Sequence, residues 1–196
     1  EQISEISPSA AEELITVMGE RLRFTNEARS HIHTLSGDVP YFIQIICKYC
    51  GLFAVEKKRS IIGYPELEYV IKILTGEHEY EQGSMVMPLP ENVFQNNMFS
   101  PADPKEVNVL ITSLAYFNRE NIENQRGVGM VELQELWAKK NIQAFRSKLA
   151  EAIELLLEKK VILQYGLPVY KLSVDLFRRW WGQHHNDLTR EIDTIL

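Results

Sequence analysis

The chain has 196 residues, of which 45% are hydrophobic and 24% are charged, and its formal net charge is −6. Such a chain is long enough to bury a sizeable core in one large or two small domains, and no stretch approaches the roughly 20 apolar residues of a membrane span. The composition therefore indicates a globular protein, which we expect to be soluble and cytoplasmic, with no signal peptide and no membrane partner.

The charge is spread unevenly along the sequence. Residues 1–104 carry 8 Lys and Arg against 15 Asp and Glu, whereas residues 105–182 carry 12 against 9, a net charge of +3. This asymmetry suits two domains with different partners, although +3 is far from the strongly basic surface of a dedicated nucleic-acid binder. Because the first residue is Glu1 rather than Met, we also expect the sequence to be a fragment of a longer protein.

Four short helices are predicted in the first 75 residues. A Ser-Pro pair, a Thr cap and two further prolines mark their first turns, where capping hydroxyls and proline are favoured. The predicted starts are Pro8, Thr25, Pro40 and Pro65, with a brief extended link at Ile61–Ile62. Together these helices should form a small bundle.

The stretch Leu35–Gln44 must end one helix and begin the next. Gly37 can take the left-handed conformation that closes a helix, Asp38 can cap the next one, and Pro40 can sit in its first turn. The helix that follows, expected over about residues 40–57, is rich in aromatic residues at helical spacing. Its predicted inward face consists of Tyr41, Phe42, Ile45, Ile46, Tyr49, Leu52 and Phe53.

Residues 76–103 contain acidic residues, prolines and no sustained period, and are predicted to be a linker or an irregular arm that packs in part through Phe94, Met98 and Phe99. Asp103, Pro104 and Glu106 then start a helix, because they combine a cap, a first-turn proline and a capping-box carboxylate.

Two more helices and a hairpin follow in the sequence. A short helix runs from Val131 to Trp137 and a long one over about residues 144–159, and residues 161–165 and 169–173 read as a hairpin joined at Gly166. Three helices and a hairpin make a winged helix. A final helix begins near Leu176 and can continue through Leu196.

Two stretches resemble a known family. The stretch Leu35–Gln44, the corner between two predicted helices, is similar to the Gly-Gly-His-Pro-type junction in the helical lid of bacterial and archaeal STAND ATPases, a branch of the AAA+ superfamily. Gly37, Pro40 and Gln44 match this junction. Asp38 and Val39 stand where Gly and His are more usual. The sequence Tyr-Lys-Leu-Ser-Val-Asp-Leu-Phe-Arg-Arg-Trp, residues 170–180, resembles the end of the winged-helix domain that follows the lid in the same ATPases.

The resemblance implies a mainly α fold: a four-helix lid subdomain at residues 1–75, the linker or arm at 76–103, a winged-helix domain at 104–182 and a C-terminal helical extension at 183–196. It further implies that Gly37 and Pro40 face a nucleotide held by an upstream P-loop domain of the same chain, so that the parent protein is an ATPase using ATP or ADP with Mg²⁺. On this hypothesis the chain is a regulatory fragment that couples the nucleotide state of that domain to signalling or assembly.

The chain itself contains no Gly-x-x-x-x-Gly-Lys-Ser/Thr loop, so it lacks the phosphate cradle of P-loop enzymes. We therefore predict no catalytic residue, no cofactor and no ATP hydrolysis in this segment. The sequence leaves open the signal sensed, the effector, the oligomeric state, and whether Asp38 and Val39 abolish the nucleotide contact.

Two other functions stay open. A winged-helix transcriptional regulator could bind DNA phosphates through the basic cluster Lys139, Lys140, Arg146 and Lys148, although the outward face of the same helix continues with Glu151, Glu154 and Glu158, which would repel them. Alternatively, a protein-interaction adaptor could dock a partner, or a second copy, through Trp180 and Trp181.

The remaining chemistry-bearing residues are predicted to be structural or solvated. Cys47 and Cys50 lie in an apolar helix, where cysteine behaves as a small hydrophobe, so we predict neither a redox pair nor a metal site. Adjacent or alternating histidines on a helix point in different directions, which places His31, His33, His184 and His185 on the surface. The carboxylates Glu77, Glu79 and Glu81 are interpreted as solvating charge.

Overall fold

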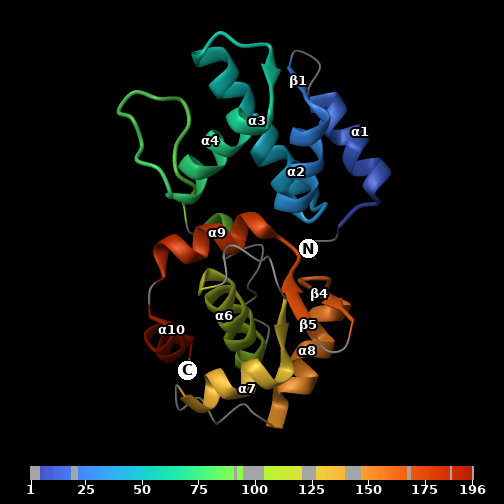
Figure 1. Ribbon diagram of the computed structural model, residues 1–196, viewed down its shortest axis with the longest axis vertical. Helices are drawn as coiled ribbons and strands as arrows, with labels where there is room; N and C mark the ends of the chain where they lie inside the picture. The colour runs from blue at the N-terminus through green and yellow to red at the C-terminus, as the bar shows by residue number, and fades with distance from the viewer. Residues whose placement is uncertain are drawn as a thin grey trace. The chain divides into compact units, whose positions relative to one another are not determined.

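In the computed structural model the described part of the chain is mainly helical, with two small sheets (Figure 1). The structure describes residues 5–18, 22–90, 92–94, 104–120, 127–139, 147–166, 169–185 and 187–195. The chain divides into two compact units: Ile3–Pro90 with Val174–Gln183 form the first, and Glu91–Ser173 with His184–Leu196 form the second. The chain therefore leaves the first unit, returns to it and leaves it again.

The first unit contains a bundle of helices and a two-stranded parallel sheet. Its elements are α1 (Pro8–Met18), β1 (Arg23–Phe24), α2 (Asn26–Ser36), α3 (Pro40–Glu56), β2 (Ile61–Ile62), α4 (Tyr64–Thr75) and, after the second unit, α9 (Asp175–His184). The predicted helix starts are confirmed: the Ser7 hydroxyl accepts the Ala10 amide at 3.3 Å, and the Thr25 hydroxyl accepts the Ala28 amide at 3.3 Å. These caps satisfy amides that the first turn of a helix leaves unpaired.

The core of the first unit lies along α3. Phe42, Ile46 and Phe53 are buried as predicted, but Tyr41 is 39% exposed, and the buried stripe also includes Ile43, Cys47, Cys50 and Ala54. Because α1, α2 and α4 all pack against α3, its buried surface is wider than one amphipathic stripe. The prediction that both cysteines are buried hydrophobes is confirmed.

The segment after α4, from Gly76 to Pro90, folds back on the first unit and does not form a free linker. Gly76, with φ 80°, closes α4, and the Leu89 amide donates to the Leu74 carbonyl at 2.9 Å. The carboxylate of Glu56 accepts the Ser84 hydroxyl and the Met85 amide, both at 2.9 Å. Phe94 is fully buried as predicted, whereas Met98 and Phe99 lie outside the described residues.

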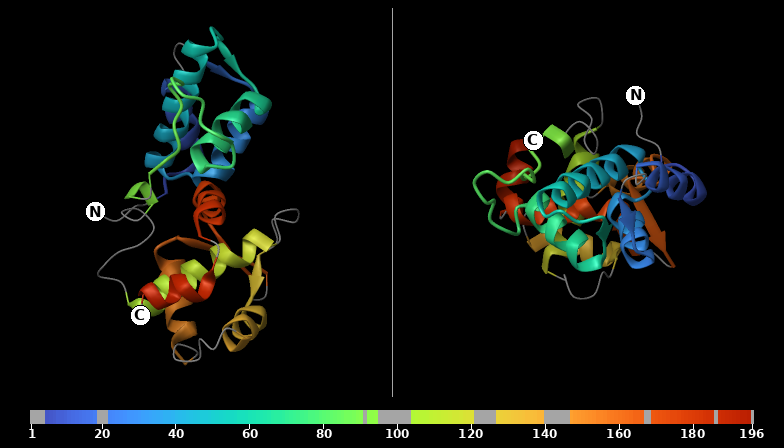
Figure 2. Two further views of the ribbon diagram at one scale, coloured as in Figure 1. Left: turned by 90° about the vertical axis from the view of Figure 1, so that its left-hand side faces the viewer. Right: turned by 90° about the horizontal axis from the view of Figure 1, so that it is seen from above.

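The second unit contains helices and a three-stranded antiparallel sheet. Its elements are α6 (Lys105–Glu120), β3 (Val128–Gly129), α7 (Met130–Lys139), α8 (Leu149–Glu158), β4 (Ile162–Tyr165), β5 (Val169–Leu172) and α10 (Leu188–Ile195). The predicted hairpin is confirmed, and β5 also pairs with β3, giving the order β3-β5-β4. Helix α6 packs against both α8 and α10 (Figure 2). Two residues are too short to show an alternating pattern, so the sequence did not reveal β3.

Several helix boundaries in and near the second unit differ from the predicted ones. Helix α8 begins at Leu149, whereas residues 144–146 lie outside the described residues. The short helix predicted from Val131 to Trp137 is α7, which extends over Met130–Lys139. The final helix does not run continuously to Leu196: α9 ends at His184 and α10 begins at Leu188. Among the described helices, none combines the length and apolarity that a bilayer span requires.

Candidate functional site

The corner between α2 and α3 is built from two consecutive residues with positive φ. Gly37 has φ 57° and ψ 30°, and its amide donates to the His33 carbonyl, which closes α2 in the way the sequence predicted. Asp38 has φ 58°, which is uncommon for a residue with a side chain. Val39 is extended, with φ −80° and ψ 118°, and Pro40 occupies the first turn of α3. Gly37 and Pro40 are both partly exposed, so a ligand could reach this corner.

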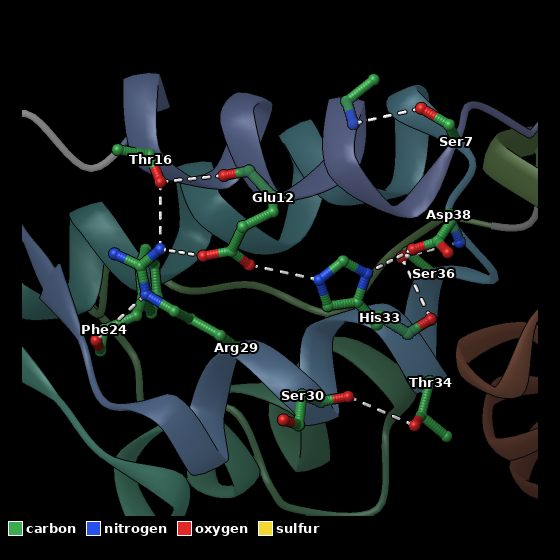
Figure 3. A network of polar contacts seen from close by, with 11 residues as sticks. Ser7, Glu12, Thr16, Phe24, Arg29, Ser30, His33, Thr34, Ser36 and Asp38 are labelled. Atoms are coloured by element: carbon green, nitrogen blue, oxygen red, sulfur yellow. Dashed lines mark hydrogen bonds and ion pairs between the residues drawn. The ribbon is translucent and has the colours of Figure 1, made fainter.

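The prediction that Asp38 caps α3 is wrong. Val39 holds the capping position, without a side-chain cap, and the Asp38 carboxylate turns back toward α2, where Oδ1 lies 2.5 Å from His33 Nδ1 (Figure 3). The backbone of Asp38 is also engaged: its amide donates to the Ser36 hydroxyl at 3.2 Å, and its carbonyl accepts the Ile6 amide at 3.0 Å. Asp38 therefore joins α2, the corner and the segment that leads into α1.

His33 continues this network toward α1. Its Nε2 lies 3.3 Å from Glu12 Oε2, and the other carboxylate oxygen of Glu12 pairs with the Arg29 guanidinium, which also donates to the Thr16 hydroxyl at 3.0 Å (Figure 3). We call Glu12, Arg29, His33 and Asp38 the corner cluster. The prediction that His33 lies on a solvated surface is wrong, because its side chain is only 25% exposed and bridges two carboxylates.

The corner cluster shifts the pKa values of two of its members. Burial alone would lower the pKa of His33, but hydrogen bonds to Asp38 and Glu12 outweigh it and raise the pKa above its ordinary value. Burial alone would raise the pKa of Glu12, but hydrogen bonds from Arg29 and His33 lower it. The cluster therefore holds charges of both signs, and it joins helices rather than presenting a nucleophile with a base.

A second cluster joins α9 to the rest of the first unit. The Arg179 guanidinium donates to both oxygens of Glu77, at 2.7 and 2.9 Å, and to Glu68 Oε1 at 2.8 Å, and His31 Nε2 lies 2.6 Å from the same Glu68 oxygen. We call His31, Glu68, Glu77 and Arg179 the return-helix cluster. Arg179 is 12% exposed and Glu68 is 18% exposed. His31 and Glu77 were predicted to be solvated, and both predictions are wrong, whereas Glu79 and Glu81 are exposed as predicted.

Burial and pairing act in opposite directions on the pKa values of the return-helix cluster. Burial would raise the pKa of Glu68, but His31 and Arg179 lower it to about 2. Burial would likewise lower the pKa of Arg179, but Glu77 and Glu68 raise it further above its already high ordinary value. Each charge is therefore held by an opposite charge, as partly buried ions require.

Trp180 and Trp181, the residues of the predicted docking surface, have buried side chains in this structure. They are 3% and 2% exposed, and the Trp180 indole Nε1 donates to the Leu89 carbonyl at 3.1 Å. A Trp indole that is buried normally finds such a partner. Trp180 therefore fixes α9 to the segment that follows α4.

The predicted basic cluster is only partly described. Lys139 is exposed at the end of α7, and Lys148 Nζ lies 2.5 Å from Glu106 Oε1, whereas Lys140 and Arg146 lie outside the described residues. The outward residues Glu151, Glu154 and Glu158 of α8 are exposed. Within the described part of this face, Lys148 is paired and acidic residues follow it, which disfavours contact with a phosphate backbone.

The remaining histidines and the cysteines offer no further site. His184 is exposed, as predicted, but His185 Nδ1 lies 3.0 Å from Glu191 Oε2. Burial raises the pKa of Cys47 to about 12 and that of Cys50 well above its ordinary value, so both thiols stay protonated and unreactive. Within the described ranges, no group of three His, Cys, Asp or Glu side chains could hold a metal ion.

The sequence singled out Gly37 and Pro40 and missed the side chains around them. Arg29 and His33 are four residues apart on α2, which could have suggested a shared face, but Glu12 and Arg179 reach their partners only through tertiary packing. No protein-family model, no curated protein and no solved structure matches this chain.

Proposed function

We propose that the chain is the helical lid and winged-helix region of a STAND or AAA+ type ATPase, in which it couples the nucleotide state of an upstream P-loop domain to signalling or assembly. The observation that carries the proposal is the order of elements along the chain. A helical bundle with a left-handed Gly37 and a first-turn Pro40 is followed by a second unit in which the helices α6, α7 and α8 precede a hairpin.

The topology of the second unit supports the winged-helix part of the proposal. The order helix, short strand, helix, helix, strand, strand is the one a winged helix uses, and the short strand β3 pairs with β5, the second strand of the hairpin. The sheet order β3-β5-β4 follows from that pairing. Gly127, directly before β3, lies so close to β5 that a Cβ added there would be 2.4 Å from a Val169 side-chain carbon.

The return-helix cluster supports the proposed coupling between the lid and the winged helix, because it holds α9, the helix that follows the hairpin, in the first unit. Helix α9 directly follows β5 in the chain but belongs to the first unit, and Arg179 and Trp180 bind it to residues of α4 and of the segment after it. A displacement of the hairpin would therefore act on the lid through a short, anchored connection. On this proposal, Gly37 and Pro40 are the nucleotide-facing residues.

The proposal is tested on the longer natural chain that it requires. It should contain a Gly-x-x-x-x-Gly-Lys-Ser/Thr loop upstream of residue 1 and bind ATP with Mg²⁺, and Pro40→Ala should weaken that binding. If the upstream sequence lacks a P-loop, the ATPase assignment fails and a protein-interaction adaptor becomes the better hypothesis.

Two measurements on the 196-residue chain distinguish the proposal from its rivals. Because the chain has no P-loop, calorimetry should show no ATP binding tighter than about millimolar, and micromolar binding would contradict the upstream assignment of the nucleotide core. Because α8 carries an acidic outer face, duplex DNA should bind only weakly at low salt. Nanomolar, sequence-dependent DNA binding that Lys148→Ala abolishes would favour the transcriptional regulator.

A further inference from the structure

The ring of His33 faces a carboxylate at each of its two nitrogens. Nδ1 lies 2.5 Å from Asp38 Oδ1 in the corner, and Nε2 lies 3.3 Å from Glu12 Oε2 on α1. An ionised carboxylate only accepts hydrogen bonds, and a neutral imidazole carries a single N–H, so a neutral ring can satisfy one of these contacts and must turn a lone pair toward the other. The imidazolium form is the one that donates to both of the carboxylates that Figure 3 draws beside the ring.

We propose that His33 is a proton-dependent clamp: when protonated it ties α1 to the α2–α3 corner through Glu12 and Asp38, and when it loses its proton this tie opens on the Glu12 side. The proposal rests on the geometry of the corner cluster and is independent of the proposed function. Histidine suits this task because its charge changes near neutral pH.

The shorter contact decides which side opens. Asp38 is the nearer carboxylate, so a neutral ring keeps its N–H on Nδ1 and leaves the lone pair of Nε2 facing Glu12. Glu12 keeps its pair with Arg29, so α1 remains attached to α2 but loses its side-chain tie to the corner, while the backbone bond from Ile6 to Asp38 remains. The Ile6 amide, bonded to the Asp38 carbonyl, lies two residues before α1 and reports on this joint.

The charges around His33 determine the direction of the pH response. The charged groups that face it are Glu12 from α1 and Asp38 from the corner, with Arg29 behind Glu12, while the side of α2 toward α4 is occupied by the pair of His31 and Glu68. Two carboxylates against one guanidinium favour the protonated ring, in accord with the raised pKa of His33. The clamp is therefore fully closed below the ordinary histidine pKa of about 6.5 and opens as the pH rises through the higher pKa of the folded state.

The first test is an NMR titration of the intact 196-residue chain. The His33 ring should titrate with a midpoint above about 6.5, and the amide resonances of Ile6 and Gly37 should shift with the same midpoint. The exposed His78 supplies the control: His78→Gln should leave the Ile6 and Gly37 titrations unchanged. A His33 midpoint at or below 6.5, or Ile6 and Gly37 amides that do not follow it, would overturn the proposal.

The second test follows thermal unfolding between pH 6 and pH 8.5. The wild-type midpoint temperature should fall by about 2–4 °C over this interval, the size expected for the loss of one charge-assisted contact in a chain of this length. His33→Gln should remove most of that fall, Glu12→Gln should reduce it while the pair with Asp38 keeps the remainder, and His78→Gln should retain it. If His33→Gln folds and keeps the wild-type pH slope, the clamp does not exist. If it fails to fold, the Glu12→Gln slope and the wild-type titration decide the question.

Discussion

The corner cluster and the return-helix cluster have the same arrangement of charges but different cations. Both belong to the first unit, and both place a cation between two carboxylates that come from different parts of the chain. In the corner cluster the cation is the imidazolium of His33, which loses its proton near neutral pH, whereas in the return-helix cluster it is the guanidinium of Arg179, which stays charged at every pH at which the protein folds. The same geometry can therefore give one helix joint whose central cation loses its charge near neutral pH and one whose central cation does not.

Among the variants that test this comparison, Arg179→Leu should lower the free energy of unfolding the most. It leaves Glu68 and Glu77 partly buried without their cation, so the free energy of unfolding should fall by about 3 kcal/mol. Arg59→Leu is the matched control, because Arg59 pairs with Glu66 at 2.9 Å but is 54% exposed and should cost less than about 1 kcal/mol. Urea denaturation measures both, and equal losses would show that Arg179 is not a buried anchor.

The loss of stability at acidic pH should depend on Glu68. Its folded pKa of about 2 lies below the ordinary value of 4.5, so its contribution is present above pH 4.5 and is lost as the pH falls toward 2. This loss should amount to about 2 kcal/mol in the wild type and should be absent in Glu68→Gln. Denaturation at pH 5 and pH 3 tests it, and a variant with the wild-type difference between these two values would contradict the assignment.

Gly37→Val should destabilise the corner itself. A β-branched side chain at φ 57° costs on the order of 1–2 kcal/mol, because Cβ approaches the following carbonyl in the left-handed region. Gly51→Ala provides the contrast: Gly51 lies inside α3, a Cβ added there meets no atom within 4 Å, and alanine should stabilise the helix by about 0.5–1 kcal/mol. Thermal melts that shifted in the same direction for both variants would argue against the backbone explanation.

Asp38→Asn should separate the charge of Asp38 from its backbone conformation. Asparagine tolerates positive φ as well as aspartate does, so the variant removes the carboxylate but retains the turn. We expect a loss of about 1 kcal/mol at pH 6, where His33 is protonated, and a smaller loss as the pH rises and the ring becomes neutral. A cost that is independent of pH would show that Asp38 acts through the turn alone.

Pro40→Ala should have the smallest effect on stability. The first turn of a helix accepts alanine as well as proline, so the free energy of unfolding should change by less than about 0.5 kcal/mol. If the proposed function is correct, the same variant should weaken nucleotide-dependent closure in the longer natural chain, because Pro40 would contact the nucleotide side only in the closed lid. Unchanged nucleotide affinity and closure would make the junction a structural turn.

The sequence could predict the interactions that span only a few residues. The helix starts at Pro8 and Pro40 follow from proline and capping chemistry, and the left-handed end of α2 follows from the missing Cβ of Gly37, which needs no distant partner. The hairpin β4–β5 was predictable for the same reason, since a turn of a few residues sets its register.

The tertiary structure alone decided where the charged side chains go. His33 and Glu12 are 21 residues apart, and Arg179 and Glu77 are 102 residues apart, so neither pair leaves a period in the sequence. From the sequence, an isolated histidine or carboxylate on a helix is indistinguishable from a solvated one, and α9 reads as part of the winged-helix domain. Packing places α1 beside α2 and returns α9 to the first unit, and the cost of burying unpaired charge then brings these side chains together.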